Sequence, residues 1–433
     1  MPDPKYLLLE KFNKDSFSKN VVWIASGTAA AQAITILCTP VATRLYSPAD
    51  FGVLTVFAAV IGIIGQLSTL RYSVTIPLAD DEALAGNVLK LCFLITFVLS
   101  LFLGVIVFLF GSFLAAKFSA SHAAPYLWLL PVCLFGTGLY EALSSWAIRE
   151  KNFKLIARTN LTQGVSSSGI KIGLGWLGIK PLGLLLGLLA SQMAGSGSLF
   201  FKLINEKPFV FQSISWKGIV YAAKRFSRFP LLQFWSRLLL SLGAQLPSIF
   251  MATFYGVEIV GLFGLAYSMV NLPMNLLGAS VAQVYYAEIA TYGKSRPDKI
   301  HNLSISVIKK MFFVGIIPIG ALMTAGPWMF SLVFGVEWHD AGVYAKILSV
   351  LIMGQFVSTP IMHCLDVLER QGLQFFLNVI RILLVVSVFM LCVRYGLSSK
   401  STVLWYSVLF FAYYIAVVTI VMISLARAKK KTT

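Results

Sequence analysis

The stretch from Arg228 to Ala290 reads RFPLLQFWSRLLLSLGAQLPSIFMATFYGVEIVGLFGLAYSMVNLPMNLLGASVAQVYYAEIA. It contains two apolar runs joined by a tight turn near Gly256, and each is long enough to cross the ~30 Å hydrocarbon core of a bilayer as an α-helix. Polar residues keep a four-residue phase, which places them on one helix face. They are Gln233, Arg237, Ser241 and Gln245 in the first run and Tyr267, Asn271, Asn275 and Gln283 in the second. Polar stripes facing lipid would be costly, so both are predicted to face a bundle interior or a watery cavity.

The composition indicates a membrane protein. Of the 433 residues, 58% are hydrophobic and only 12% are charged, and the mean hydropathy of +0.81 exceeds that of soluble domains. Apolar runs of roughly 20 residues predict an all-α polytopic membrane protein with about twelve transmembrane helices in two six-helix halves. The predicted spans are 20–40, 50–72, 88–110, 125–148, 159–178, 181–203, 229–252, 258–286, 308–330, 341–365, 374–396 and 402–426.

The distribution of the basic residues predicts the topology. A net charge of +18 could suggest a nucleic-acid partner. However, in a twelve-helix arrangement with both ends on one side, that side holds nearly all Lys and Arg residues outside the spans. The exceptions are Arg44, Lys117, Lys180, Arg394 and Lys400. By the positive-inside rule the basic side is cytoplasmic, so both termini are predicted inside and no nucleic-acid partner is predicted. Contact with anionic lipid headgroups is a further use of this charge.

The chain divides into two similar halves. The predicted segments are a cytoplasmic tail (1–19), a first half (20–203), a basic cytoplasmic connection (204–228), a second half (229–426) and a basic tail (427–433). The first apolar run is read as a retained helix rather than a cleaved signal because it is full length. Gln32 and Gln245 occupy equivalent places in polar stripes of the first span of each half. Repeated halves are typical of alternating-access transporters, whose site lies at the repeat interface near the midplane.

Five charged residues lie well within the predicted spans: Glu141, Lys171, Arg237, Lys346 and Arg381. A central Lys or Arg costs ~2.5–3.5 kcal/mol even on a lenient insertion scale, so such residues are functional candidates. Lys346 is predicted to snorkel to the outer boundary. Arg237 and Lys171 are flanked in phase by Gln and Ser and are predicted to line a cavity, whereas Arg381 could do so or lie at the interface. Glu141 is either the structural partner of one cation or a proton carrier.

These patterns give a candidate substrate-binding site with a cationic, hydroxyl-binding character. Arg and Lys suit phosphate oxygens, whereas Gln, Asn, Ser and Tyr suit sugar hydroxyls. A hydrated anion with many hydroxyls is therefore the expected ligand, and no cofactor is predicted. The candidate residues are Arg237, Lys171, Arg381, Gln245, Gln32, Gln233, Asn271, Asn275, Gln163 and Asn378, with Arg71 at the cytoplasmic entrance.

The metal-ligating residue types are predicted to be structural. All five cysteines, Cys38, Cys92, Cys133, Cys364 and Cys392, fall inside predicted spans without a repeated ligand spacing, so they are interpreted as packing residues. Glu337, His339 and Asp340 form an outer cluster that is interpreted as a solvated loop end rather than a metal site.

Several longer motifs resemble a known family. They are TRLYSPADFGVLTVF (43–57), LRYSVTIPL (70–78), YGVEIVGLFGLAYSMVNLP (255–273), AQVYYAEIA (282–290) and FGVEWHDAGVY (334–344). In matching order over about three quarters of the chain, they resemble the Wzx-type oligosaccharide (O-antigen/polysaccharide) flippases of the MOP superfamily, which also holds MATE drug exporters and lipid II flippases. The chain departs from the pattern at Ser73, where an acidic residue would be expected after the Arg-Tyr pair, so an ion pair does not carry over there.

The resemblance implies a function. A Wzx-type protein would flip a polyprenyl-pyrophosphate-linked oligosaccharide across the bacterial inner membrane for surface polysaccharide or lipopolysaccharide assembly. Its further partners would be H⁺ or Na⁺ as a coupling ion and the polysaccharide polymerase machinery.

Two other functions are considered. A MATE-like cation-coupled drug exporter would need carboxylates in its cavity, but the predicted interior is net positive. A membrane polysaccharide polymerase or glycosyltransferase would need acidic or metal-binding groups on sizeable outer loops, and the predicted outer connections are short. No enzyme activity is therefore predicted.

Overall fold

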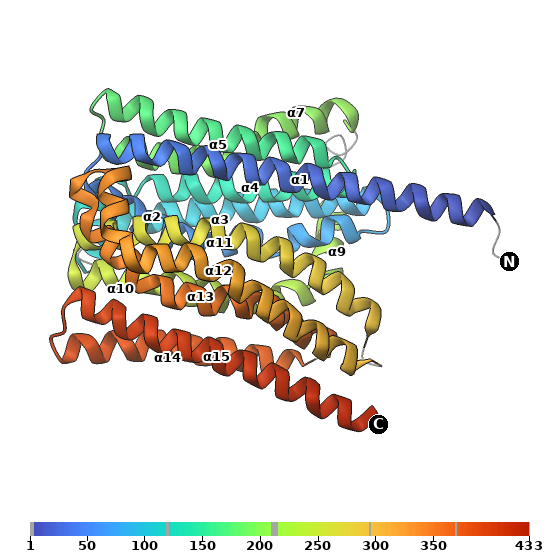
Figure 1. Cartoon of the computed structure of the whole chain (residues 1–433). Helices are drawn as coiled ribbons and strands as arrows, with labels where there is room; N and C mark the ends of the chain where they lie inside the picture. Colours follow the sequence, from blue (N-terminus) through green and yellow to red (C-terminus); the bar gives the residue numbers. More distant parts are fainter. Residues whose placement is uncertain (1–3, 118–120, 209–214, 294–295, 369, 433) are drawn as a thin grey trace. The chain divides into compact units, whose positions relative to one another are not determined.

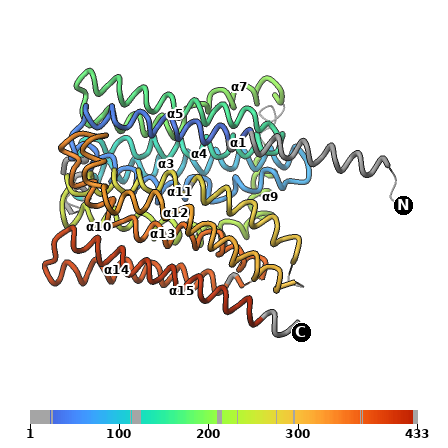
Figure 2. Tube along the Cα trace, viewed as in Figure 1, coloured from blue at the N-terminus to red at the C-terminus, as the bar shows by residue number. Residues whose placement is uncertain are grey.

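The computed structural model describes residues 4–117, 121–208, 215–293, 296–368 and 370–432 (Figure 2). Within these ranges the chain is helical and contains no strand (Figure 1). The first part contains α1 (Pro4–Leu45), α2 (Pro48–Ile64), η1 (Gly65–Leu67), η2 (Tyr72–Leu78), α3 (Glu82–Lys117), η3 (Ser121–Tyr126), α4 (Leu129–Arg149), α5 (Phe153–Trp176), α6 (Leu182–Met193), α7 (Ser196–Glu206) and α9 (Trp216–Arg225). The second part contains η4 (Phe229–Gln233), α10 (Phe234–Tyr255), α11 (Val257–Tyr292), α12 (Pro297–Phe334), η5 (Val336–Trp338), α13 (His339–Val367), α14 (Gln371–Arg394) and α15 (Ser399–Thr432).

The helices confirm the predicted class of an all-α, multi-pass membrane protein. Among the described residues, nine helical stretches are long and apolar enough to cross a membrane. The predicted spans 20–40, 125–148 and 159–178 coincide with α1, α4 and α5, which are not among the nine. α5 carries a run of polar side chains that includes Lys171, which lowers its apolar character. We attribute its helical form to packing against α1 and α6 as well as to burial in lipid.

Two predicted spans end differently from expected. The span 181–203 is broken into α6 and α7, because Gly195 adopts a φ of 87° and starts a new helix. The span 50–72 ends early, because α2 gives way to η1 and the chain then turns at Leu70 and Arg71, whose φ values are 46° and 67°. Left-handed backbone is uncommon for residues other than glycine, so surrounding contacts must hold this turn.

The chain forms two compact units. Unit 1 comprises Met1–Tyr46, Val60–Lys117 and Ser121–Leu238, and unit 2 comprises Ser47–Ala59 and Leu239–Thr433. This grouping differs from the predicted halves at two places. The first turns of α2 belong with unit 2, and the start of α10 belongs with unit 1.

In unit 1, α1 packs along α5 at small residues. A Cβ on Gly27 would lie 2.6 Å from the Ala157 backbone, and one on Gly164 would lie 2.9 Å from the Ala31 backbone. Polar side chains join these helices to α4. Asn160 Nδ2 donates to Thr28 Oγ1 at 3.0 Å, and Tyr140 Oη donates to Asn160 Oδ1 at 2.9 Å.

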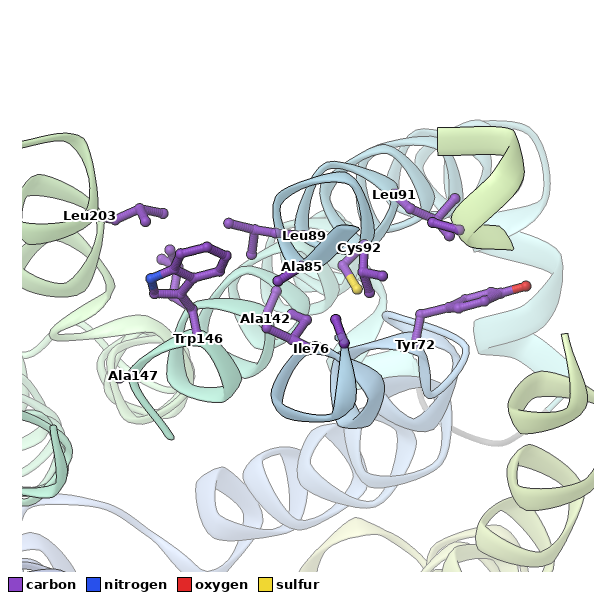
Figure 3. Packing of buried hydrophobic residues seen from close by; sticks show 14 of the residues in the cluster. Tyr72, Ile76, Ala85, Leu89, Leu91, Cys92, Ala142, Trp146, Ala147 and Leu203 are labelled. Atoms are coloured by element: carbon purple, nitrogen blue, oxygen red, sulfur yellow. The ribbon is translucent and has the colours of Figure 1, made fainter. Parts of the chain in front are cut away.

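A second packing region of unit 1 joins η2, α3, α4, α7 and α9 through a buried apolar cluster (Figure 3). Ile76, Leu89 and Cys92 are fully buried in it, and Trp146 contributes the largest ring. This cluster holds η2 against α3 and α4, which places the preceding turn beside α4.

In unit 2, α13 packs against α11, α12 and α15. The motif FGVEWHDAGVY supplies packing residues here. Trp338 is 1% exposed and lies edge-on to Phe51 with ring centroids 4.9 Å apart. Tyr344 Oη donates to Ser399 Oγ at 2.7 Å. The motif therefore has a structural role at the start of α13.

The start of α2 crosses α11 at glycines within unit 2. A Cβ on Gly261 would lie 1.8 Å from the Pro48 carbonyl oxygen, and one on Gly52 would lie 1.8 Å from the Val257 carbonyl oxygen. Helices in membranes approach this closely only where side chains are absent. This crossing explains why Ser47–Ala59 groups with unit 2.

We expect Gly261→Val to destabilise the protein by about 1–3 kcal/mol, because the new side chain meets backbone that cannot move aside. Gly320→Val on α12 is the control, since a Cβ there has no neighbour within 4 Å. The measurement is the thermal unfolding midpoint of each purified variant in the same detergent. Equal midpoints for the two variants would argue against a tight α2–α11 crossing.

Candidate substrate-binding site

Glu141 on α4 is the centre of a polar cluster in unit 1. Its carboxylate accepts hydrogen bonds from Ser68 Oγ at 3.1 Å and Ser73 Oγ at 2.7 Å. Arg71 Nη1 lies 3.8 Å from the same carboxylate, and the Arg71 and Glu141 side chains are 19% and 32% exposed. Glu141 is therefore the carboxylate partner of Arg71, which is not one of the four cations predicted within the spans.

The left-handed turn at Leu70 and Arg71 places the Arg71 and Ser73 side chains beside Glu141 on α4. Thr96 Oγ1 donates to the Ser68 carbonyl at 2.8 Å, and Tyr72 Oη donates to the Ala223 carbonyl of α9 at 3.1 Å. Contacts on both sides thus fix the strained backbone. Arg71 was predicted only as an entrance residue. The absence of an acid at position 73 does not remove the ion pair, because α4 supplies the carboxylate.

Arg237 on α10 is the second guanidinium of unit 1 and interacts electrostatically with Arg71. Its side chain is exposed, as is that of the predicted neighbour Gln233 in η4. No carboxylate of the described ranges lies within 4.0 Å of Arg237. The Arg71 Nε atom is buried without a hydrogen-bond partner. One carboxylate therefore balances two guanidinium groups in this region.

Lys171 lies on α5 with its aliphatic stem packed over Gly187 of α6. A Cβ on Gly187 would lie 2.4 Å from Lys171 Cγ and 2.9 Å from the Ser167 carbonyl. Tyr46 Oη donates to the Lys171 carbonyl at 2.8 Å and fixes the backbone at this position. The described part of the chain places no carboxylate within 4.0 Å of the Lys171 ammonium group.

We expect Gly187→Ala to impair the function that depends on Lys171, because the added methyl group displaces the lysine stem and pushes α6 from α5. Destabilisation of about 1–3 kcal/mol should accompany the loss. Gly173→Ala on α5 is the control, since a Cβ there meets nothing within 4 Å. Removing a helical glycine there should be neutral or stabilising by roughly 0.5–1 kcal/mol. Thermal unfolding measures the change in stability of both variants, which should be a loss for Gly187→Ala and none or a gain for Gly173→Ala. A stabilised Gly187→Ala protein would contradict the close contact.

Two predicted glutamines of unit 1 flank the α1–α5 crossing. Gln32 on α1 and Gln163 on α5 are both half-buried. The Gln32 Oε1 atom is buried and has no hydrogen-bond partner. An unpaired buried acceptor is costly, so a ligand hydroxyl or water would be stabilised there.

Arg381 on α14 is the central cation of unit 2. Its Cδ and Nε atoms lie 3.6 Å from the position that a Cβ on Gly243 would occupy, so the side chain packs across α10. Its Nε atom is buried without a partner. The groups that interact with it electrostatically are phenols of α11 and α15, namely Tyr267, Tyr406, Tyr413 and Tyr414. Within the described ranges no carboxylate lies within 4.0 Å of Arg381.

Asn271 links this cation to a cavity in unit 2. Its side chain is 6% exposed and lies one helical turn after Tyr267, one of the phenols that interact with Arg381. The Asn271 Oδ1 atom has no partner. A cavity of about 220 Å³ opens beside it between α11 and α13. The lining residues are Asn271, Met274, Gly278, Ala279, Ile352, Gln355, Phe356 and Thr359.

The other predicted residues have these places. Gln245 on α10 and Asn378 on α14 are half-buried in unit 2. The side chain of Asn275 lies outside the described residues. Lys346 on α13 is exposed. Each unit thus contains some of the predicted polar residues. Within unit 1, no hydrogen bond joins Gln32 or Gln163 to Lys171 among the described residues.

Sequence reasoning missed the hydroxyl groups of both clusters. Ser68 and Ser73 were overlooked because their value depends on the turn that precedes η2. The tyrosines of α15 carried a signal, since Tyr406, Phe410, Tyr413 and Tyr414 follow the helical spacing of one face. Their meeting with Arg381 required the α14–α15 hairpin.

The metal-ligating residue types lie in other surroundings. The five cysteines are free thiols, four of them buried. Asp340 pairs with Lys400 at 2.9 Å and with His339 at 3.5 Å. The described residues contain no group of three or more His, Cys, Asp or Glu side chains that could hold a metal ion.

Comparison with known proteins assigns the family. The model of the family described as polysaccharide biosynthesis protein matches residues 41–343. A curated relative, the teichuronic acid biosynthesis protein TuaB of Bacillus subtilis (strain 168), is 26% identical over 204 residues. This match covers 47% of the present chain and 40% of that protein, so it spans less than half of the relative's length.

Solved structures share the fold. An inward-facing multidrug resistance MATE family transporter of the MOP superfamily aligns with a TM-score of 0.72 and 16% identity over 93% of this chain and 96% of that chain. A MOP superfamily transporter from Pyrococcus furiosus Vc1 (DSM3638) aligns with a TM-score of 0.63 and 14% identity over 96% of both chains. The family match confirms the resemblance to polysaccharide biosynthesis proteins, and the structural matches confirm the predicted MATE-like fold. The chain belongs to the polysaccharide biosynthesis protein family and is a multi-pass membrane protein with a MATE-like transporter fold.

Proposed function

We propose that this protein flips a polyprenyl-diphosphate-linked oligosaccharide from the cytoplasmic to the outer leaflet of a bacterial inner membrane for surface polysaccharide assembly. The observation that carries the proposal is positive charge without a carboxylate partner on membrane helices. Lys171, Arg237 and Arg381 all lack a carboxylate within 4.0 Å among the residues that the structure describes.

Such charge has a cost that a bound anion would offset. A Lys or Arg at the centre of a span costs ~2.5–3.5 kcal/mol. Retaining three of them in helices without acidic partners therefore favours a functional role. Guanidinium and ammonium groups bind phosphate oxygens by charge-assisted hydrogen bonds, which are about twice as strong as neutral ones. A diphosphate supplies the missing negative charge.

The neutral polar groups suit a saccharide. The buried acceptors Gln32 Oε1 and Asn271 Oδ1 have no partner in the protein, so each can receive a hydrogen bond from a sugar hydroxyl. The cavity beside Asn271 has a volume of about 220 Å³ and includes Gln355 and Thr359. The family description and the name of the B. subtilis relative both concern polysaccharide formation, which supports a carbohydrate substrate.

Alternating access and the topology complete the proposal. The repeated halves of the sequence favour alternating access by the two units. We infer from the positive-inside rule that both termini are cytoplasmic. H⁺ or Na⁺ coupling and contact with polymerase machinery remain predictions from the family resemblance.

A MATE-like exporter of cationic drugs is the second candidate, favoured by the fold alone. Cation binding needs a free carboxylate, and Glu141 is engaged by Arg71, Ser68 and Ser73. The solved P. furiosus transporter is described as having a binding pocket of reverse polarity that suggests a different function. A cationic site in the present chain would likewise differ from a site that binds cationic drugs.

A flipping assay in proteoliposomes tests the proposal. A fluorescent polyprenyl-diphosphate-linked saccharide is inserted, and the fraction accessible to an impermeant reductant is followed with time. We expect Arg237→Gln to slow flipping on the order of tenfold or more, because a phosphate of the bound substrate then lacks its cationic partner. Arg394→Gln, at the exposed end of α14, should leave the rate unchanged. Full activity of Arg237→Gln, or transport of cationic dyes instead, would reject the proposal.

A further inference from the structure

The helix α9 in unit 1 has one face packed on the protein and the opposite face exposed. Ser215 caps its start, with Oγ accepting from Gly218 N at 3.2 Å. Ile219 and Ala222 are 6% and 0% exposed and join the apolar cluster of α3 and α4. The helix also approaches α3 closely, because a Cβ on Gly218 would lie 2.5 Å from Asn87 Nδ2. α9 is therefore firmly docked.

The exposed face of α9 is aromatic and basic. Trp216 is 63% exposed and Tyr221 is 57% exposed, with Val220 beside them. Lys217 follows Trp216 directly, and Lys224 lies about one turn after Val220 and Tyr221; both lysines are exposed. Trp and Tyr with interleaved Lys are typical of helices that lie in the headgroup region of a bilayer, where rings and ammonium groups both find suitable surroundings.

The segment that contains α9 carries charges of one sign only. Residues 207–228 contain Lys207, Lys217, Lys224, Arg225 and Arg228 and no Asp or Glu. Two of these basic residues are engaged by acids near α3: Lys207 Nζ donates to Glu82 at 2.6 Å, and Arg225 pairs with Asp80. The others, Lys217, Lys224 and Arg228, have no carboxylate within 4.0 Å in the described ranges. They remain available for external anions.

The position of α9 in the chain puts this face at a membrane surface. Two stretches long and apolar enough to cross a membrane flank it: Leu182–Glu206 ends ten positions before Trp216, and Phe229–Tyr255 begins four positions after Arg225. Asp80, the partner of Arg225 at the end of α9, belongs to the connection between two other spans, Pro48–Leu67 and Glu82–Gly111. A helix so placed lies where its exposed basic side chains can reach phospholipid headgroups.

α9 also contacts the strained turn beside Glu141. Tyr72 Oη donates to the Ala223 carbonyl of α9 at 3.1 Å. Tyr72 stands between Arg71 and Ser73, and both of these side chains contact the Glu141 carboxylate. A shift of α9 therefore acts directly on the backbone that positions the Arg71–Glu141 pair.

We propose that α9 lies in the headgroup region of the cytoplasmic leaflet, binds anionic phospholipids through Lys217, Lys224 and Arg228, and transmits that binding through Tyr72 to the Arg71–Glu141 pair. The surface discriminates by charge, because Trp216, Val220 and Tyr221 fit any bilayer interface whereas the three basic groups require anionic lipid. This inference does not depend on which substrate the protein moves.

Lipid retention tests the binding step. Wild-type protein is reconstituted in nanodiscs of phosphatidylcholine with phosphatidylglycerol, released, and analysed by native mass spectrometry for bound lipid. Lys217→Gln/Lys224→Gln/Arg228→Gln should lower the affinity for phosphatidylglycerol roughly fivefold for each charge removed, which corresponds to about 1 kcal/mol apiece. Lys217→Arg/Lys224→Arg keeps the charge and should bind as wild type. Equal phosphatidylglycerol retention by the neutralised and wild-type proteins would overturn the proposal.

A nitroxide label on Val220→Cys, in a Cys38→Ser background, tests the location of the helix. It should be more accessible to oxygen than to a water-soluble nickel reagent in nanodiscs. A water-accessible label in phosphatidylglycerol nanodiscs would instead assign the exposed face to a soluble protein partner.

Hydrogen–deuterium exchange tests the coupling step. In wild type, peptides covering residues 68–79 should exchange more slowly in phosphatidylglycerol than in pure phosphatidylcholine nanodiscs. Tyr72→Phe should retain lipid as wild type but lose this difference, because only the hydroxyl that reaches α9 is removed. A lipid-dependent difference of the same size in Tyr72→Phe would reject Tyr72 as the connection.

Discussion

Arg381→Met is expected to make the protein more stable and to abolish its transport activity. The side chain carries a permanent charge, its Nε atom is buried without a partner, and no described carboxylate lies within 4.0 Å. Replacing such a group by an apolar side chain of similar length removes its desolvation cost, so the free energy of unfolding should rise by about 1–3 kcal/mol. Loss of function together with a gain in stability is typical of a residue retained for ligand binding.

The measurement pairs thermal unfolding in detergent with the flipping assay. Arg394→Met, at the exposed end of the same helix, is the control and should change neither quantity. Tyr414→Phe provides a finer comparison, because it removes one phenol hydroxyl near Arg381 and should reduce transport less than the charge removal does. If Arg381→Met unfolds at a lower temperature than wild type, the guanidinium is a structural group and the proposed anion site of unit 2 is wrong.

Glu141→Ala is expected to act in the opposite direction and to destabilise unit 1. The change leaves Arg71 without its counter-charge and removes the acceptor of the Ser68 and Ser73 hydroxyls. Breaking a buried charged pair by deleting one partner costs about 3–5 kcal/mol. Because the Glu141 side chain is 32% exposed, we expect a smaller loss of ~2–4 kcal/mol.

A double-mutant cycle separates the ion pair from the hydroxyl contacts. Arg71→Met in the Glu141→Ala background should recover part of the lost stability, since the unpaired guanidinium is then absent. Glu288→Gln is the control: this exposed carboxylate on α11 accepts a hydrogen bond from Tyr292 one turn away, and its replacement should change stability by less than roughly 0.5 kcal/mol. Equal losses for Glu141→Ala and Glu288→Gln would show that the cluster does not stabilise the turn.

The structure explains why the two clusters differ. In unit 1 the carboxylate of Glu141 neutralises Arg71. Removing this carboxylate leaves the guanidinium unpaired and therefore lowers the free energy of unfolding. In unit 2 the groups that interact electrostatically with Arg381 are phenols, which supply no negative charge in their neutral form. A ligand anion would complete the second cluster, whereas the first already contains its own.

Helical periodicity predicted most of the fold but missed its interruptions. The long spans were found because an apolar run of sufficient length has few alternatives in a bilayer. The break at Gly195 and the early end of α2 were missed, because each depends on a single backbone conformation that neighbouring helices hold in place. The assignment of Ser47–Ala59 to unit 2 was missed for a similar reason: the glycines of α2 and α11 matter only once the two helices meet.

The candidate residues show the same limit. Arg381 and Asn271 were predicted from their positions on helix faces, and both have buried polar atoms without partners. Their tyrosine neighbours belong to a helix that follows Arg381 in the chain, and periodicity within one helix cannot identify the partner helix. Glu141 was predicted to be either the partner of a cation within the spans or a proton carrier. Its contact with Arg71 depends on a left-handed turn that the sequence does not mark with glycine.

The sequence by itself determined that this chain is a multi-pass helical membrane protein with too many basic side chains for its acidic ones, because hydrophobicity, length and charge are properties of each segment alone. Only the tertiary structure decided which cations are neutralised. Arg71 has a carboxylate within 4.0 Å, whereas Lys171 and Arg381 have none among the described residues. The physical reason is that charge pairing falls off within a few ångströms, and distances of that size between different helices depend on how the helices pack.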